Sequence, residues 1–474
     1  MNKGVLLLIM IFSLYFQFPA TGSSIETVGQ REIKREKINK QFDRMNLREK
    51  TDFVVDTSDQ LLAEPAEKAT VRDFVVAAKP PTVKMRIVPF MQPEYFFDLT
   101  YDSEAYMIAW SNWAHVTRSE DNRFYFSVSD HRGQGCHLFI YEYCPARNTV
   151  DKVVDYGKVV GWTDKTLTDG KIHGHMGIMP DGTLWAPSHV GVDPDSSWFA
   201  NGYRGSWLIS YNIFTHEAVN WGIPLIGNCL PCFYVDTRRG ILCGTGETSS
   251  SFLCWDCVNK KIRFAGYPPH GWIWWDRAML CDPETGIFWS NDSNDEKKRF
   301  MSFDPTLNLF KRYEISPPEN TFEHKVDHLR GYTDHPAMDG WFYCSTWNGA
   351  FFRFKPSGPH GPVVEPLGTT WDTGRDTLQM AVNPSGRYVY FLPKGNAPII
   401  QYDVKAGKKK VICWLQDYYH NKYGYWMDHC YGLEISRDGS FLVICMNGEF
   451  EERGMKAFGH PSLLVVQIPE EERR

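Results

Sequence analysis

Beyond its first residues, the sequence lacks any apolar run that approaches the length needed to cross a bilayer. It also lacks an excess of positive charge, because 57 aspartates and glutamates outnumber 51 lysines and arginines and give a formal net charge of −6. A third absence is any long helical pattern between the short apolar runs. These absences argue against a membrane span and against nucleic acid as a partner, and they favour β structure. An anionic substrate stays open, because local basic residues can set the field of a cleft.

The first 23 residues have the features of a secretory signal. Lys3 precedes the apolar run Val5–Phe16, and small residues follow at Gly22 and Ser23. This order of a basic residue, a short apolar segment and small residues is typical of a cleaved signal peptide at residues 1–23. We therefore expect a secreted protein, extracellular or periplasmic, with no membrane span.

Residues 24–83 are expected to form a charged extension ahead of the main domain. Within it, residues 31–50 are dense in charge, and Ile33, Ile38 and Phe42 are spaced roughly as one helical face. We predict a short, exposed helical segment here and assign it no chemistry.

From residue 84 to 474, a strand pattern recurs at intervals of about 50 residues. A repeat of this length, with several short strands in each copy, is typical of a β-propeller. A two-sheet sandwich would not normally copy one unit so often. The seven copies predict an all-β fold of seven four-stranded blades. The markers are strands ending in an aromatic and a polar residue at Tyr141-Glu142, Tyr211-Asn212, Trp255-Asp256, Phe303-Asp304, Phe354-Lys355 and Tyr402-Asp403, with a weaker copy at 463–468.

The twelve cysteines leave three alternatives open. An even number in a secreted chain permits disulfides. Two pairs, Cys229–Cys232 and Cys254–Cys257, have the spacing of a tetrathiolate zinc site. Against zinc, strand alternation would send Cys254 and Cys257 to opposite faces. Structural zinc, disulfides and buried free thiols all stay open, and none of them makes these cysteines catalytic.

The most informative segment runs from Lys171 to Gly191. It places His173 and His175 before one short strand and His189 after the next, with an Asp-Gly turn between them. Imidazoles at strand ends can act as acids, bases or metal ligands, or can simply bond a backbone carbonyl. In a propeller, we expect the first and last of these histidines to face the central channel, with His131 at the same rim.

Aromatic and basic residues elsewhere suggest a sugar site. Indole rings stack on sugar faces, and guanidinium groups pair with carboxylate or sulfate. The tryptophans can instead pack between blades, and the arginines can instead form structural salt bridges. The candidates for substrate binding are His175, Arg204, Arg277, Arg330, Trp185, Trp274, His270 and His131.

The motif KIH…DGTLW…SHVG, from Lys171 to Gly191, resembles the motif KIH…DGK(I/L)Y…THxG of secreted propellers related to oligosaccharide and ulvan lyases. The resemblance covers roughly residue 123 to the C-terminus. A similarity to a broader set of exported bacterial propellers is carried by residues 329–346, 385–393, 398–415 and 431–440.

The resemblance implies β-elimination on a uronic-acid polysaccharide, with no cofactor required for the chemistry. In such lyases a cation or donor neutralises the uronate carboxylate, a base removes the neighbouring proton and an acid protonates the departing oxygen. On the motif match, His173 and His189 take the two histidine positions. Pro231 stands where the family has its tyrosine, so Tyr234 and Tyr203 are the candidate catalytic tyrosines. The family's following arginine has no clear counterpart.

Three hypotheses about function follow. The first is a monomeric secreted lyase acting on an anionic polysaccharide or oligosaccharide. The second is a non-catalytic propeller that binds glycan or protein. The third is a metal-dependent enzyme with His173, His175 and His189 as ligands, near Asp130 and Asp193. Structural zinc or calcium stays open in each.

Overall fold

A computed structural model describes most of the chain. The described residues are 36, 53–65, 74–88, 110–130, 136–163, 167–190, 200, 202–358, 361–371, 375–395, 398–451 and 459–473. The expected signal peptide at 1–23, nearly all of the charged segment 31–50, His131 and Asp193 lie outside these ranges. Within them, no helix has the length and apolarity needed to cross a membrane.

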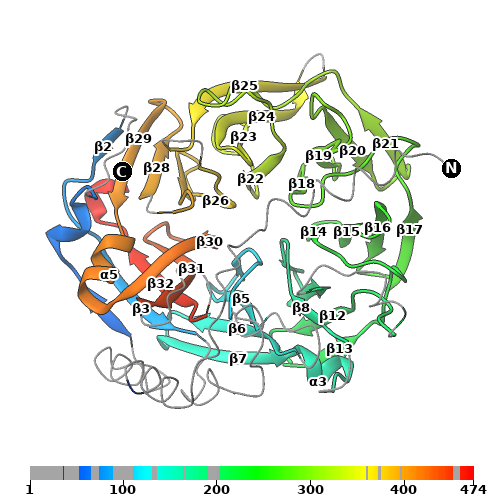
Figure 1. The fold of residues 1–474 in the computed structure, drawn as a ribbon, viewed down its shortest axis with the longest axis horizontal. Coiled ribbons are helices and arrows are strands. Elements are labelled where there is room, and N and C mark those ends of the chain that lie inside the picture. Colours follow the sequence, from blue (N-terminus) through cyan, green and yellow to red (C-terminus); the bar gives the residue numbers. More distant parts are fainter. Residues whose placement is uncertain are drawn as a thin grey trace, which may run out of the picture.

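The described residues form a ring of seven blades, which confirms the all-β propeller (Figure 1). The first four blades are four-stranded antiparallel sheets. Their strands are β4 (Thr117–Arg118), β5 (Phe124–Ser129), β6 (Leu138–Cys144) and β7 (Thr149–Asp155); β9 (Gly177–Ile178), β10 (Thr183–Pro187), β12 (Leu208–Asn212) and β13 (Ala218–Asn220); β14 (Cys232–Asp236), β15 (Ile241–Gly246), β16 (Ser251–Asp256) and β17 (Lys261–Gly266); and β18 (Leu280–Cys281), β19 (Phe288–Asn291), β20 (Phe300–Asp304) and β21 (Leu309–Arg312).

The fifth and sixth blades are joined into one sheet, because their first strands pair in parallel at Tyr332 and Gln379. Short elements lie between blades: β8 (Asp169–Lys171) pairs with β11 (His189–Val190), and two helices are α3 (Tyr156–Val160) and α5 (Gln416–Tyr423). The strands of these blades are β22 (Leu329–Thr333), β23 (Phe342–Thr346), β24 (Ala350–Gly358) and β25 (Gly361–Thr369), then β26 (Gln379–Val382), β27 (Tyr388–Phe391), β28 (Ile399–Asp403) and β29 (Lys408–Cys413).

The seventh blade closes the ring with strands from both ends of the described chain. Its strands are β30 (Tyr425–Ile435), β31 (Phe441–Phe450) and β32 (Ser462–Gln467), followed by β3 (Thr82–Ile87) and β1 (Val54–Asp56). A further strand, β2 (Phe74–Val76), pairs in parallel with β29. The expected domain boundary at residue 84 is therefore too late, since it falls inside β3 and the preceding strands also belong to propeller sheets. β3 pairs with β32, whose backbone edge would otherwise have no hydrogen-bonding partner.

The repeat marker has a physical basis. Every aromatic–polar pair, and the weaker copy at 463–468, lies on the third strand of its blade. In β20, Phe303 packs on Phe252 and Phe310 with ring centroids 4.7 and 4.8 Å away. The next residue, Asp304, accepts hydrogen bonds from two backbone N–H groups of the following turn. The aromatic ring thus joins neighbouring blades, and the carboxylate fixes the turn that starts the outer strand.

Candidate functional site

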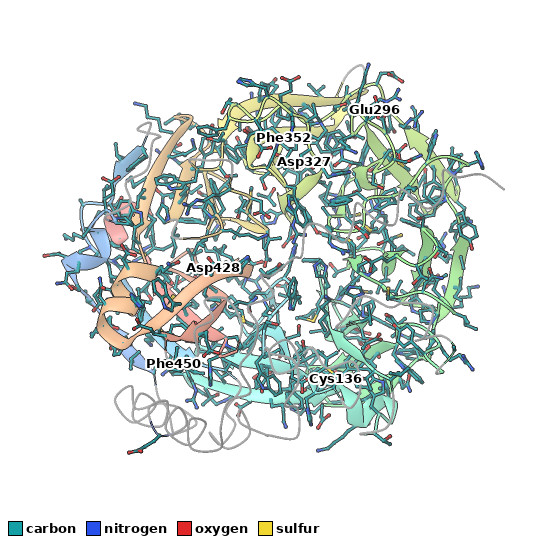
Figure 2. The ribbon with its side chains drawn as sticks, in the orientation of Figure 1. Cys136, Glu296, Asp327, Phe352, Asp428 and Phe450 are labelled. Carbon is teal, nitrogen blue, oxygen red and sulfur yellow. The ribbon has the colours of Figure 1, made fainter. Side chains whose placement is uncertain are left out.

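The first strands of the blades converge on the axis of the ring, and the candidate site lies there. We call the group formed by His173, His189, Arg277, Arg330 and Tyr431 the His173 cluster. Its members come from the second, fourth, fifth and seventh blades. Figure 2 shows the side chains in the same orientation; the labelled Asp428, on β30, lies near the middle of the ring and Glu296 near its rim.

His173 has a defined hydrogen-bonding state. Its Nδ1 contacts the backbone oxygen of Pro231, and a carbonyl oxygen can only accept, so Nδ1 donates. In the neutral imidazole, Nε2 then carries the lone pair. The residue is 6% exposed. Burial lowers the pKa of His173 well below its usual value, and the nearby charges of Arg277, Arg330 and Lys171 lower it further.

Aromatic rings and a second imidazole surround His173. The ring of His189 lies 5.9 Å from it, the ring of Trp113 5.9 Å, and the ring of Tyr431 6.2 Å, each between centroids. Lys171 Nζ lies 4.7 Å from the Trp113 ring centroid. The Tyr431 hydroxyl makes no hydrogen bond to any described residue, whereas most buried tyrosines find a partner. It is therefore available to a ligand.

Glu247 connects His189 to Arg277. Its Oε2 lies 3.8 Å from His189 Nε2 and accepts from the Cys229 thiol at 3.4 Å, while Oε1 accepts from Arg277 at 3.1 Å. Burial acts to raise the pKa of Glu247, but the charge and hydrogen bond of Arg277 outweigh it and lower the pKa. For Asp276, burial prevails over the attraction of Arg277 and raises the pKa, with Glu247 adding to the rise. Neighbouring carboxylates thus differ in proton affinity.

Arg330 is 3% exposed and extends the positive charge across the centre. Its Nε lies 3.6 Å from Asp376, and it donates to the backbone oxygen of Arg277 at 3.0 Å. Its guanidinium carbon lies 5.8 Å from the Tyr431 ring centroid, and Lys394 Nζ lies 5.9 Å from the same ring. Cations from the fifth and sixth blades therefore both lie beside the Tyr431 ring.

A second group is the triad of His115, His175 and Asp334, in which His175 lies two residues after His173 in the sequence. His175 Nε2 is 3.3 Å from Asp334 Oδ2, and His115 Nδ1 is 3.9 Å from Asp334 Oδ1. Burial lowers the pKa of His115 to about 3, although Asp334 acts to raise it. Burial acts to raise the pKa of Asp334, but the two imidazoles outweigh it and lower the pKa to about 2. The triad therefore pairs an ionised carboxylate with a neutral imidazole.

The hydroxyl groups of the two tyrosines predicted from the sequence, Tyr203 and Tyr234, already bond to acceptors outside the His173 cluster. The Tyr203 hydroxyl donates to Asp169 at 2.5 Å. The Tyr234 hydroxyl donates to the backbone oxygen of Asp334 at 3.1 Å, and its ring stacks on His175 at 4.3 Å. The tyrosine beside His173 is Tyr431, on the first strand of the last blade, and it was not among the residues predicted from the sequence.

Several predicted sugar-binding residues lie away from the centre. Trp185, which is fully buried, packs on Trp221 and Trp255, and Trp274 packs on Phe252 and Phe310 within another core layer. These indoles serve inter-blade packing, the alternative that the sequence left open. Two further candidates, Arg204 and His270, are exposed and belong to neither group.

The two CxxC pairs do not converge on one point. Cys254 lies in the core layer with Cys232, Cys257 lies in the layer on the other side of the sheet, and Cys229 contacts Glu247. Strand alternation separates the sulfurs, so the tetrathiolate zinc site is not formed. All twelve cysteines are among the described residues, and each is buried as a free thiol.

The three histidines predicted as metal ligands do not lie together as one ligand set. His173, His175 and His189 do not form one group with compatible ligand atoms among the described residues. Two other groups do, each with ligand atoms within 4.8 Å of one another: the triad, and a set formed by His189, Cys229 and Glu247.

Known proteins resemble this chain only weakly in the comparisons below. No protein-family model matches the chain, and no curated protein matches it. Similar solved structures include Kuenenia stuttgartiensis hydrazine synthase (TM-score 0.45, 11% identity, 73% of this chain and 95% of that chain) and the WD40 repeats of RRP9 (0.48, 8%, 81% and 97%). Another is the Cps50 (Swd1) β-propeller domain of Myceliophteria thermophila (0.47, 8%, 76% and 97%). Likenesses at this level carry no information about ligand or reaction, and the propeller assignment rests on the seven blades themselves.

Proposed function

We propose that the protein is a polysaccharide lyase that cleaves a uronic-acid glycan by β-elimination at the His173 cluster. The observation that carries the proposal is the bond from His173 Nδ1 to the Pro231 carbonyl, which leaves Nε2 as an acceptor beside two arginines and a tyrosine. We also propose, from the signal-like residues 1–23, that the protein is exported to meet such a substrate.

Arg277 and Arg330 would neutralise the uronate carboxylate. A carboxylate next to the C5–H bond makes that proton acidic only when its own charge is compensated, so a lyase needs cations or donors at this point. The backbone oxygen of Arg277 accepts from Arg330, which supports both side chains acting on one group. Glu247 holds Arg277 from the far side, and His189 adds a second imidazole.

His173 and Tyr431 would carry the proton transfers. Nε2 of His173 takes the C5 proton, the C5–H electrons form the C4–C5 double bond, and the C4–O bond breaks. The Tyr431 hydroxyl donates its proton to the departing glycosidic oxygen. No redox change occurs. Before the next turnover, His173 must release the proton it took to solvent, and Tyr431 must regain one from solvent. The mechanism requires no metal.

The test is an ultraviolet assay of the purified chain against ulvan, pectate, alginate and glycosaminoglycans, because the unsaturated product absorbs where the substrate does not. We expect rising absorbance on at least one polysaccharide, unchanged by chelator. His189→Ala should abolish most of it, whereas His216→Ala, at an exposed turn, should not. No signal with any substrate, together with retained glycan affinity, would contradict elimination and support the glycan-binding hypothesis.

A further inference from the structure

We propose that His115, His175 and Asp334 form a binding site for one divalent transition-metal ion, with Zn²⁺ as the first ion to test. The site is distinct from the His173 cluster, and its argument does not depend on the lyase proposal. Two imidazoles and one carboxylate are a ligand set that zinc, iron and related ions accept.

The spacing of the ligand atoms fits one ion. Zinc ligands lie about 2.1 Å from the metal, so two of them in a tetrahedral site are about 3.4 Å apart. His175 Nε2 and Asp334 Oδ2 are 3.3 Å apart, and His115 Nδ1 and Asp334 Oδ1 are 3.9 Å apart. The second distance is too long for a hydrogen bond but needs only a small movement to become a ligand–ligand edge.

Buried atoms without hydrogen-bond partners supply an independent observation. Among the described residues, His115 Nδ1, His175 Nδ1 and Asp334 Oδ1 are all buried and unpaired. His115 is 8% exposed and His175 is 9% exposed. Buried polar atoms without partners are rare in native proteins, and two of these three, His115 Nδ1 and Asp334 Oδ1, lie 3.9 Å apart at the proposed site. A cation held at this point would satisfy His115 and Asp334 together.

The neighbours of the triad orient its members. Gln379 Nε2 donates to Asp334 Oδ2 at 3.2 Å, and Tyr234 donates to the backbone oxygen of the same aspartate. The Tyr234 ring also stacks on His175, which fixes the imidazole plane. Groups of this kind commonly fix metal ligands.

The three ligands come from different parts of the ring. His115 precedes β4 of the first blade, His175 precedes β9 of the second, and Asp334 follows β22 of the fifth. An ion bound by all three would therefore connect blades across the centre. Because the unfolded chain does not hold these residues together, the ion would stabilise the folded ring.

The other group, His189 with Cys229 and Glu247, is less suited to a metal. Arg277 already compensates the Glu247 charge at 3.1 Å. Burial raises the pKa of the Cys229 thiol well above its usual value, and Glu247 raises it further. A metal bound at this group would have to displace the thiol proton and share Glu247 with Arg277.

The test is the metal content of the purified full chain after dialysis against metal-free buffer, measured by plasma mass spectrometry with Zn²⁺ as the added ion. We expect about one zinc per chain, and less than a fifth of that in His115→Gln, His175→Gln and Asp334→Asn. His328→Gln is the matched control, because His328 also contacts an aspartate, Asp327 at 2.9 Å, outside the triad. It should keep full occupancy.

A second measurement covers variants that fail to fold. Co²⁺ added to the chelator-treated wild-type chain should produce visible absorption bands of a tetrahedral or five-coordinate site, saturating at one equivalent. Zn²⁺ should then displace it and raise the thermal midpoint. Absence of stoichiometric zinc together with absence of cobalt bands in the wild-type protein would overturn the proposal, as would triad variants with unchanged occupancy.

Discussion

His173 and His175 are two residues apart in the sequence, yet their surroundings have opposite charge. His173 lies among Arg277, Arg330 and Lys171, with its Nδ1 bound to a carbonyl. His175 lies against the Asp334 carboxylate. The first arrangement suits an anionic ligand and the second suits a cation. The residues across the ring, rather than the local sequence, decide what each imidazole can do.

Buried carboxyl groups give the same lesson. Asp334, between two imidazoles, has its pKa lowered to about 2. Asp169 forms no ion pair with any residue that the structure describes, and burial raises its pKa to about 6 despite the hydrogen bonds it accepts from Ser188 and Tyr203. Hydrogen bonds alone therefore do not offset the burial of this charge, whereas the imidazoles beside Asp334 do.

The largest effect should come from Tyr431→Phe. The change removes only the hydroxyl and keeps the ring against His173 and Arg330, so the fold should survive. Loss of the acid should lower kcat by about 10²–10⁴-fold on the substrate that responds in the ultraviolet assay. Tyr313→Phe, which removes a hydroxyl near Ser302 far from the cluster, should leave kcat unchanged. Equal rates for the two variants would exclude Tyr431 as the acid.

Arg277→Gln should separate the anion-binding role of the His173 cluster from its chemistry. The variant loses the cation that would bind the uronate carboxylate, and KM should rise by about tenfold or more. Arg238→Gln is the matched control, because that arginine bonds a surface carbonyl of Pro283. An unchanged KM in Arg277→Gln would place the carboxylate elsewhere.

Asp334→Asn should test whether the triad of His115, His175 and Asp334 binds a cation. Chelator should lower the thermal midpoint of the wild-type chain, because an ion joining three blades stabilises only the folded state. The variant should start with a lower midpoint and show no response to chelator. The thermal midpoint is measured by scanning calorimetry. A wild-type midpoint that chelator does not change would show that no bound metal stabilises the fold.

The smallest effect concerns Asp169→Asn. With the folded pKa at about 6 and the ordinary value at 3.8, the folded state binds a proton that the unfolded state lacks as pH falls below about 6. The contribution of Asp169 to the free energy of unfolding therefore rises, by about 1 kcal/mol between about pH 7.5 and about pH 5. Urea unfolding of both chains at these pH values should show this difference.

Asp304→Asn, at a surface turn, is the control for that experiment. It should show the same pH dependence as the wild-type chain. A difference between wild type and Asp169→Asn that does not change with pH would mean that Asp169 is already protonated, or equally ionised in both states, across this range.

The sequence predicted the fold because the stabilising device is local and repeated. Six of the seven copies carry an aromatic residue for the inter-blade layer, and four of them carry an aspartate or asparagine for the next turn. The N-terminal strands were not predicted, because β3 pairs with the distant strand β32, β1 pairs with β3, and neither strand carries the repeat marker. Their pairing forms only when the ring closes, and no local sequence pattern predicts contacts between such distant segments.

The sequence named four of the five members of the His173 cluster. His173, His189, Arg277 and Arg330 were all named from the sequence, and they lie together. Tyr431 and Asp334 were not among the predicted residues, and the fold brings them beside His173 and His175 from the seventh and fifth blades. A tryptophan in a blade core and one at a sugar site have similar local sequence, so Trp185 and Trp274 were indistinguishable from ligand-binding residues until the packing was known.

The most direct test of the central claim is the absorbance of a uronic-acid polysaccharide incubated with the wild-type chain or with His173→Gln. Gln keeps a hydrogen-bond donor for Pro231 but has no basic nitrogen. We expect the ultraviolet absorbance to rise with the wild-type chain and to change very little with the folded variant. Equal rates from both proteins would contradict the assignment of His173 as the base.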